Sequence, residues 1–196
     1  MSKSTPRLAR SAKAKAKYGR RSYREAMPYL LKETGDRCAY SCQHLQRANG
    51  KLEVDHFNPT LKHPERNFHD NLLPASRHCN GAKWDWWPTK LERKLGARFL
   101  NPYKEQDYGS HLFENPTTHE IESATVEGWY HIAKLDLNAP HLVRERRQRA
   151  EIWAQLTIGP VTIVGPTQSV QECARVLREQ AEEMIPALPL LGQLAD

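Results

Sequence analysis

The chain has 196 residues, of which 39% are hydrophobic, and a formal net charge of +6. This length suits one domain with additions and excludes two large domains. No stretch reaches the roughly 20 apolar residues that cross a bilayer, and the N-terminus lacks the apolar segment of a secretory signal, so we expect a cytoplasmic protein with no membrane contact.

The first feature in chain order is a basic segment, residues 1–21. Nine lysines and arginines precede the first acidic residue, Glu25, and subtracting them from +6 leaves −3 for the rest of the chain. This concentration is typical of a flexible arm that neutralises phosphates, so Arg20 and Arg21 are predicted to contact DNA. A solubilising or merely disordered tail is an equally good interpretation.

The next segment, residues 22–100, contains short elements separated by turns. The predicted order is a helix over about 22–33 that Gly35 ends, a tight turn "DRCAYSCQ" that displays two thiols, a strand "KLEVDHF", a long loop, a strand "NLLPAS", and a helix over about 78–87 that Pro88 ends. The local order is therefore strand, loop, strand, helix.

The two strands and the second helix carry groups that bind metal or accept protons. Asp55 and the amide oxygen of Asn80 suit Mg²⁺ or Mn²⁺, and the imidazole of His56 can accept a proton from water near neutral pH. Neighbouring side chains in a regular strand face opposite ways, so the strand must end or bend between Asp55 and His56 if both serve one site. The amide of Asn71 has the donors and acceptor needed to pin the loop backbone.

The second helix places Asn80, Lys83, Trp84 and Trp87 on one face, at spacings of three and four residues. We expect Lys83 to lie beside the metal and to meet a phosphate of bound DNA. The three tryptophans at 84, 86 and 87 could stack on bases, but packing of the helix against the rest of the chain is the preferred interpretation.

This ordered combination resembles the HNH endonuclease family over roughly residues 37–88. The resemblance implies an α+β fold with a ββα-metal (HNH) core, and metal-dependent hydrolysis of DNA phosphodiester bonds. It also implies the roles of individual residues. His56 would be the general base, Asn71 would support the loop that holds it, and Asp55 and Asn80 would bind Mg²⁺ or Mn²⁺.

Many members of that family bind a structural zinc through two Cys-x-x-Cys pairs, and this chain departs from the pattern. Its first pair, Cys38 and Cys42, is one residue longer, and Cys79 has a serine three residues before it where a second thiol would stand. His78 or His44 could complete a zinc site with the three thiols, because serine is a poor zinc ligand. Three buried thiols without zinc are nearly as good an interpretation.

Beyond residue 100 we expect a mainly helical extension, residues 101–196, that contains a short hairpin. The hairpin is predicted from "SHLFEN" and "HEIESAT", and helices are predicted over about 124–136, 140–157 and 168–185. The run "RERRQR" in the second of these helices is either a phosphate-binding face or a solvated or partner-binding face. Apolar residues among prolines near the C-terminus favour partner binding, although they could equally cover the protein's own core.

A narrower resemblance extends from residue 37 to about 157. The segments "EVDHFNP", "NLLPASRHCNGAK", "FLNP" and "KLDLNAPHLVRERRQRAEI" are similar to the small HNH subunits of Septu-type and retron-linked anti-phage systems. This resemblance implies an ABC-type ATPase partner, with the nuclease as effector. The alternative is a nucleic-acid-binding or scaffolding subunit that keeps the ββα shape without cleavage.

Overall fold

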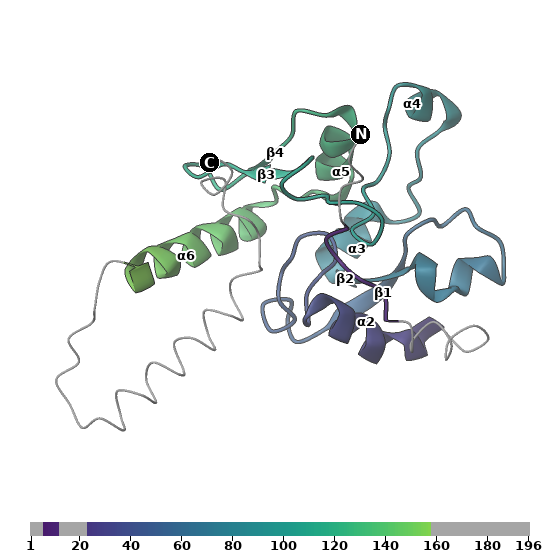
Figure 1. Cartoon of the computed structure of the whole chain (residues 1–196), viewed down its shortest axis with the longest axis horizontal. Coiled ribbons are helices and arrows are strands. Elements are labelled where there is room, and N and C mark those ends of the chain that lie inside the picture. Colours follow the sequence, from purple (N-terminus) through teal and green to yellow (C-terminus); the bar gives the residue numbers. More distant parts are fainter. Residues whose placement is uncertain (1–5, 12–22, 158–196) are drawn as a thin grey trace.

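The computed structural model describes residues 6–11 and 23–157, and it has an α+β architecture (Figure 1). The described residues form two small antiparallel sheets and several helices. Arg20 and Arg21, the predicted helix over 168–185 and the apolar C-terminal residues all lie outside the described ranges. In the part of the chain that is described, no helix is both long and apolar enough to cross a membrane.

The centre of the molecule is a two-stranded sheet followed by a helix. β1 (Leu52–His56) pairs antiparallel with β2 (Leu72–Ser76), and their register places His56 opposite Leu72. α3 (Arg77–Lys83) begins directly after β2 and contacts both strands. The hydroxyl of Ser76 caps this helix by accepting a hydrogen bond from a backbone N–H in its first turn. The predicted order of strand, loop, strand and helix is therefore confirmed.

Both faces of this sheet are covered, which explains why all five residues of β2 are buried. One face packs against a 3₁₀ turn, η1 (Tyr23–Ala26), and against α2 (Met27–Thr34), with Leu30 and Leu72 in contact at the centre. Gly35 ends α2 with a left-handed backbone, φ 59°, as predicted. The other face of the sheet belongs to the main core.

The loop between the strands begins directly after His56 and contains two short 3₁₀ turns, η2 (Glu65–Asn67) and η3 (His69–Asn71). The thiol-bearing turn also forms as predicted, since the N–H of Cys42 donates to the carbonyl of Cys38 at 3.0 Å. This turn lies along the free edge of β2, where the N–H of Ala39 donates to a β2 carbonyl at 2.8 Å.

The helix predicted over 78–87 ends early, at Lys83. The next residue, Trp84, has φ 46° and ψ −137°, and the N–H of Trp86 donates to the carbonyl of Lys83 at 2.9 Å. These contacts define a β-turn whose first central residue has positive φ, a position that glycine normally occupies. A bulky residue in such a conformation costs roughly 1–3 kcal/mol.

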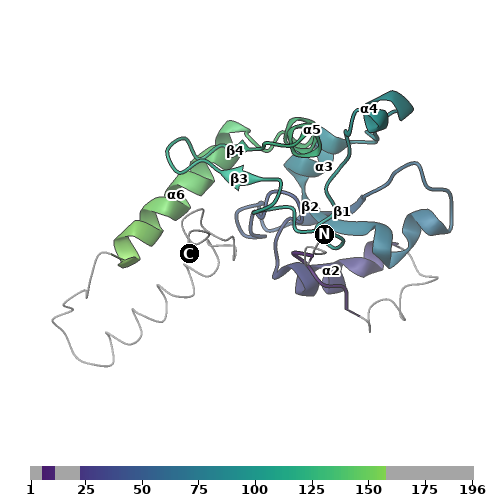
Figure 2. The same cartoon turned by 45° about the horizontal axis from the view of Figure 1, so that its top comes forward.

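The extension after residue 88 forms the predicted hairpin and the two predicted helices up to residue 157. Its elements are α4 (Lys90–Lys94), β3 (Phe113–Glu114), β4 (Ile121–Glu122), α5 (Val126–Leu135) and α6 (Pro140–Thr157). β3 pairs antiparallel with β4, and α5 packs on α3. Both views show α6 leading away from the central sheet (Figures 1 and 2).

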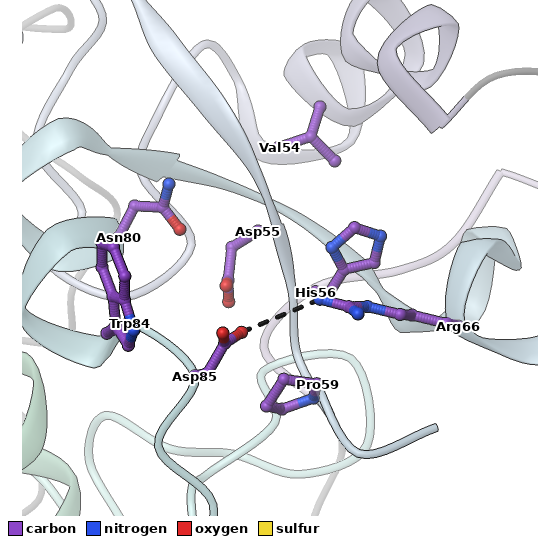
Figure 3. A pocket seen from close by; sticks show the side chains of 8 residues that line it. All are labelled: Val54, Asp55, His56, Pro59, Arg66, Asn80, Trp84 and Asp85. Atoms are coloured by element: carbon purple, nitrogen blue, oxygen red, sulfur yellow. Dashed lines mark ion pairs between the residues drawn. The ribbon is translucent and has the colours of Figure 1, made fainter. Parts of the chain in front are cut away.

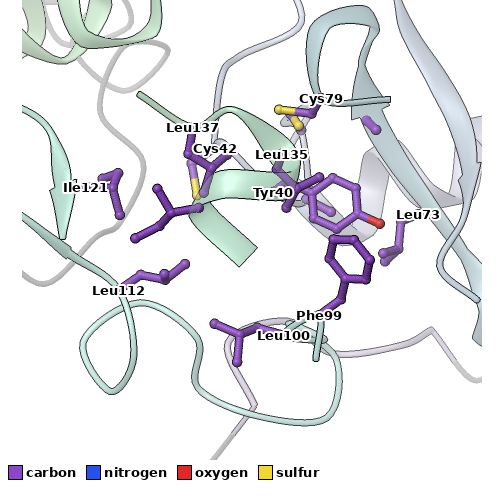
Figure 4. Packing of buried hydrophobic residues seen from close by; sticks show 14 of the residues in the cluster. Tyr40, Cys42, Leu73, Cys79, Phe99, Leu100, Leu112, Ile121, Leu135 and Leu137 are labelled. Atoms are coloured by element: carbon purple, nitrogen blue, oxygen red, sulfur yellow. The ribbon is translucent and has the colours of Figure 1, made fainter. Parts of the chain in front are cut away.

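One hydrophobic core joins the central unit to this extension (Figure 4). Tyr40 and Leu73 from the central unit lie in the same buried cluster as Phe99, Leu112 and Leu135. The predicted boundary at residue 100 is therefore not a break in packing, because described residues on both sides of it bury one another.

Part of the predicted basic arm is docked rather than flexible. The guanidinium of Arg7 donates to Asp107 at 2.6 and 2.9 Å, and Arg10 donates to Glu33 at 3.1 Å and to the carbonyl of Leu72 at 2.8 Å. These two arginines therefore form hydrogen bonds and ion pairs within the protein. We call the contact between Arg7 and Asp107 the junction, because it joins the N-terminal segment to the extension.

Candidate active site

A cavity of about 220 Å³ opens beside β1 and the end of α3 (Figure 3). It is lined by Val54, Asp55, His56, Pro59, Arg66, Asn80, Trp84 and Asp85. Three of the four residues predicted for catalysis and metal binding, all except Asn71, border this one space. Among the described residues, the cavity therefore defines the candidate site.

Asp55 and His56 share the cavity although the predicted break between them is absent. β1 continues through both residues, and Figure 3 shows their side chains leaving opposite sides of the strand. Because β1 ends at His56, the cavity extends around the strand end and reaches both side chains. The prediction that they serve one site needs no bend in the backbone.

The carboxylate of Asp55 is buried and held by two side chains. The Nζ of Lys83 donates to its Oδ1 at 3.0 Å, and the hydroxyl of Tyr40 donates to its Oδ2. Burial and the neighbouring carboxylate hold the pKa of Tyr40 well above its usual value, so its phenol remains a donor. The carboxylate is thereby fixed in orientation at the wall of the cavity.

Lys83 lies beside the predicted metal ligand Asp55, but its ammonium is engaged by that carboxylate instead of facing a phosphate site. Its side chain is fully buried, and its Nζ also donates to the carbonyl of His56 at 2.9 Å. From this position Lys83 cannot meet a phosphate without leaving Asp55. Instead, it ties the metal-binding candidate to the end of β1.

His56 is half-buried and arranged as a neutral base. Its Nε2 lies 3.0 Å from the amide oxygen of Asn67, so Nε2 carries the proton and Nδ1 keeps the lone pair. Burial lowers the pKa of His56, the bond to Asn67 opposes that change, and the charge of Arg66 lowers the pKa further. The net shift is downward, which keeps the imidazole uncharged near neutral pH.

Asn71 lies outside the cavity and makes the loop contacts expected of it. Its Oδ1 accepts from the N–H of Asn58 at 2.9 Å. Its Nδ2 donates to the carbonyl of Asn58 at 3.2 Å and to that of Arg66 at 2.9 Å. One buried amide thus closes both ends of the loop segment that follows His56.

Sequence reasoning missed Glu53, which orients Asn80. The Nδ2 of Asn80 donates to Glu53 at 2.7 Å, and Figure 3 shows the amide oxygen turned toward Asp55. Glu53 lies two residues before Asp55 in β1, and this spacing places both side chains on one face of a strand. This spacing is visible in the sequence and could have identified Glu53 as a neighbour of the site.

Arg66 and Asp85 were also missed, and they face each other across the cavity (Figure 3). Their charged groups are 3.7 Å apart, with the side chains 42% and 71% exposed. Exposed pairs of this kind contribute little stability. The guanidinium of Arg66 can therefore turn to an anionic ligand at small cost.

The packing interpretation of the tryptophans holds only for Trp87. Its ring packs against Phe57 and Phe99, with centroid distances of 5.6 and 6.0 Å. Trp84 and Trp86 are 73% and 55% exposed. Trp84 borders the cavity, whereas Trp86 lies under the ammonium of Lys134, 4.1 Å from the ring centroid.

The thiols Cys38, Cys42 and Cys79 are buried and free. Burial raises the pKa of Cys38, but hydrogen bonds with Cys79 and Ser41 lower it to about 5. His78 does not join them, because its Nε2 lies 3.0 Å from the carbonyl oxygen of Asp136. Within residues 6–11 and 23–157, no three His, Cys, Asp or Glu side chains are grouped to hold a metal ion, so structural zinc stays a prediction.

The basic run on α6 is used partly for internal contacts. Arg146 is buried and donates to the carbonyls of His119 and Leu137, at 2.6 and 3.0 Å. Arg149 pairs with Glu114 in β3. These two arginines attach α6 to the hairpin, so they do not form the phosphate-binding face that was one interpretation of the run.

Comparison of the chain with protein-family models, with curated proteins and with solved structures finds no match. The geometry of the cavity and the motifs that form it are therefore the evidence on function.

Proposed function

We propose that this protein is a metal-dependent endonuclease that hydrolyses DNA phosphodiester bonds, with a ββα-metal core of the HNH type. One observation carries the proposal. Asp55, His56 and Asn80 border a single cavity, and Asn71 secures the loop beside it. A general base next to two oxygen ligands for a divalent ion is the set of groups that phosphodiester hydrolysis requires.

The proposed base is the Nδ1 of His56. It accepts a proton from a water molecule as the water oxygen attacks phosphorus, and the bond from phosphorus to the 3′ oxygen breaks. The contact with Asn67 holds the ring, and the lowered pKa keeps Nδ1 able to accept the proton. The guanidinium of Arg66 is placed to bind a phosphate oxygen once it leaves Asp85.

The residues at the cavity fit a hard divalent cation. Mg²⁺ is commonly held by one or two carboxylates and keeps several waters, and here Asp55 and the oxygen of Asn80 would be the protein ligands. Such an ion, when bound, stabilises negative charge on the phosphate and on the leaving oxygen. Lys83 and Tyr40 fix Asp55, and Glu53 fixes Asn80, so both ligands are oriented before an ion binds.

The test is nicking of supercoiled plasmid with Mg²⁺ or Mn²⁺. His56→Ala should lower the rate by at least ~10²-fold, because it removes the base. His63→Ala is the matched control, since this exposed histidine lies in the same loop outside the cavity. Equal rates in wild type and His56→Ala would remove His56 from the mechanism. Absence of cleavage in wild type with preserved DNA binding would support the scaffolding alternative.

We further propose that the protein is the effector of an anti-phage system and binds an ABC-type ATPase through residues 101–196. The support is the resemblance of residues 37–157 to small HNH subunits of such systems, together with an extension that adds a hairpin and two helices within the described residues. Co-purification from the native operon tests this proposal. A protein that purifies alone and cleaves at full rate would contradict it.

A further inference from the structure

Trp84 has a combination of properties that packing does not explain. Its backbone adopts φ 46° and ψ −137°, a conformation that glycine adopts without strain. Its side chain is 73% exposed, so the strain is not offset by burial of the ring. A glycine here would make the same turn at lower free energy. Strain together with exposure points to a contribution of the indole other than stability of the fold.

The position of the ring indicates what it contributes. Trp84 borders the same cavity as Asp55, His56 and Asn80. Its turn follows directly from the helix that carries Asn80, because the N–H of Trp84 donates to the Asn80 carbonyl at 2.9 Å. The exposed indole is thus fixed to the metal-binding candidate through the backbone. A phosphodiester bound beside Asp55 and Asn80 would bring its neighbouring nucleotide toward the part of the cavity that Trp84 lines.

We propose that Trp84 is a specificity-determining residue that stacks on an unpaired base next to the phosphodiester being cleaved, so that the preferred substrate is single-stranded or locally unpaired DNA. This proposal rests on the proposed nuclease function.

Stacking chemistry and charge favour a nucleobase as the occupant. Exposed aromatic rings and cations that line one groove are the usual platform for single-stranded nucleic acid, and Trp84 and Arg66 line the same cavity. Within a duplex both faces of each base are covered by its neighbours, so a ring at the rim of a site can stack only on a base that is unpaired or displaced. Duplex DNA would present phosphates to Arg66 but no free base to Trp84.

Trp86 provides a matched control. It is two residues away, is 55% exposed and lies outside the cavity lining. Its ring is already in contact with the ammonium of Lys134. A general effect of losing one exposed tryptophan from this turn would therefore appear in both variants, whereas base stacking at the cavity involves only Trp84.

The first experiment measures binding without cleavage. In the His56→Ala background, a labelled single strand and the duplex of the same sequence are titrated with Trp84→Ala, Trp84→Phe and Trp86→Ala proteins. Trp84→Ala should weaken single-strand binding at least about fivefold while duplex affinity stays unchanged, and Trp84→Phe should keep most of the affinity. Trp86→Ala should match the parent. Equal losses on both DNA forms, or no loss, would overturn the proposal.

The second experiment separates stacking from folding. Trp84→Gly relieves the backbone strain, so its melting temperature should rise while its single-strand affinity falls as in Trp84→Ala. With His56 intact, wild type should cleave a duplex with a central bulge faster than a fully paired duplex, and Trp84→Gly should lose this preference. If wild type cleaves DNA and Trp84→Gly keeps the preference, stacking is wrong and the nuclease stands. If wild type cleaves no DNA, the nuclease proposal itself fails.

Discussion

Two ion pairs of this chain with a buried carboxylate, Lys83 with Asp55 and Arg7 with Asp107, differ in what surrounds them. At the junction, Arg7 also donates to the carbonyl of Ala39 at 2.5 Å, and Asp107 also accepts from the N–H of Tyr108 at 2.9 Å. Asp55, in contrast, borders a cavity. Burial of a charge therefore does not indicate function by itself. A buried charge indicates function when a ligand can reach it.

The largest effect is expected at the junction. Arg7→Met leaves the carboxylate of Asp107 buried without its cation, and such a loss typically destabilises a protein by about 3–5 kcal/mol. Urea unfolding measures the change. Because the side chain of Asp107 is only 1% exposed, added Mg²⁺ should not restore stability. Restoration by Mg²⁺ would show that Asp107 is accessible and would remove the contrast between the two pairs.

A smaller effect is expected at the cavity. Lys83→Met also leaves a carboxylate unpaired, but water or a cation can reach Asp55, so we expect a loss of about 1–3 kcal/mol. Millimolar Mg²⁺ should recover part of this loss, because a cation replaces the ammonium. Cleavage should nevertheless fall, since Asp55 loses one of the two contacts that orient it. Urea unfolding of Lys83→Met and Arg7→Met, each with and without Mg²⁺, tests the prediction.

A buried histidine of the core, His131, and the cavity histidine, His56, should also respond differently to acid. Burial, and secondarily the charge of Arg7, lowers the pKa of His131 to about 3, and its Nδ1 accepts from the N–H of Leu100. Below about pH 6.5 the unfolded chain binds a proton at this position that the folded chain does not, so acid favours unfolding. The expected loss from His131 is about 2 kcal/mol between pH 6.5 and 5.

His131→Asn should flatten that pH dependence, because asparagine keeps an acceptor but does not titrate. His56 should instead govern activity: its pKa is lowered, so cleavage should persist below pH 6.5 and fall only as the imidazole is protonated. Unfolding and nicking measured over the same pH series separate the two histidines. Identical pH profiles for both properties would mean that loss of activity reports unfolding alone.

The sequence predicts the local features of this fold well. Gly35 ends a helix, alternation marks β1, and a helix follows the strand "NLLPAS", because each of these depends on a few neighbouring residues. The loop contacts of Asn71 were foreseeable for the same reason. A loop that leaves a strand end and returns beside it needs a polar side chain to close it.

The sequence could not predict contacts that depend on distant parts of the chain. Arg7 was assigned to a DNA-binding arm because its partner, Asp107, is 100 residues away. Lys83 was placed at a phosphate because its spacing from Asn80 is visible in the sequence, whereas the approach of Tyr40 and Asp55 around it is not. The early end of α3 escaped prediction for another reason. Nothing local indicates that a tryptophan will occupy a conformation that favours glycine.

The single hydrophobic core limits how much of the chain must be kept if the proposed catalytic unit is transplanted. The ββα segment supplies the reactive groups, but Leu112, Ile121 and Leu135 of the extension fill the same interior as Tyr40. Because Tyr40 donates to Asp55, removing these side chains would loosen the proposed metal ligand as well as the scaffold. An excised fragment ending at residue 100 would carry every motif residue but would lack the buried side chains that keep them in place. The smallest portable unit therefore includes the hairpin and α5.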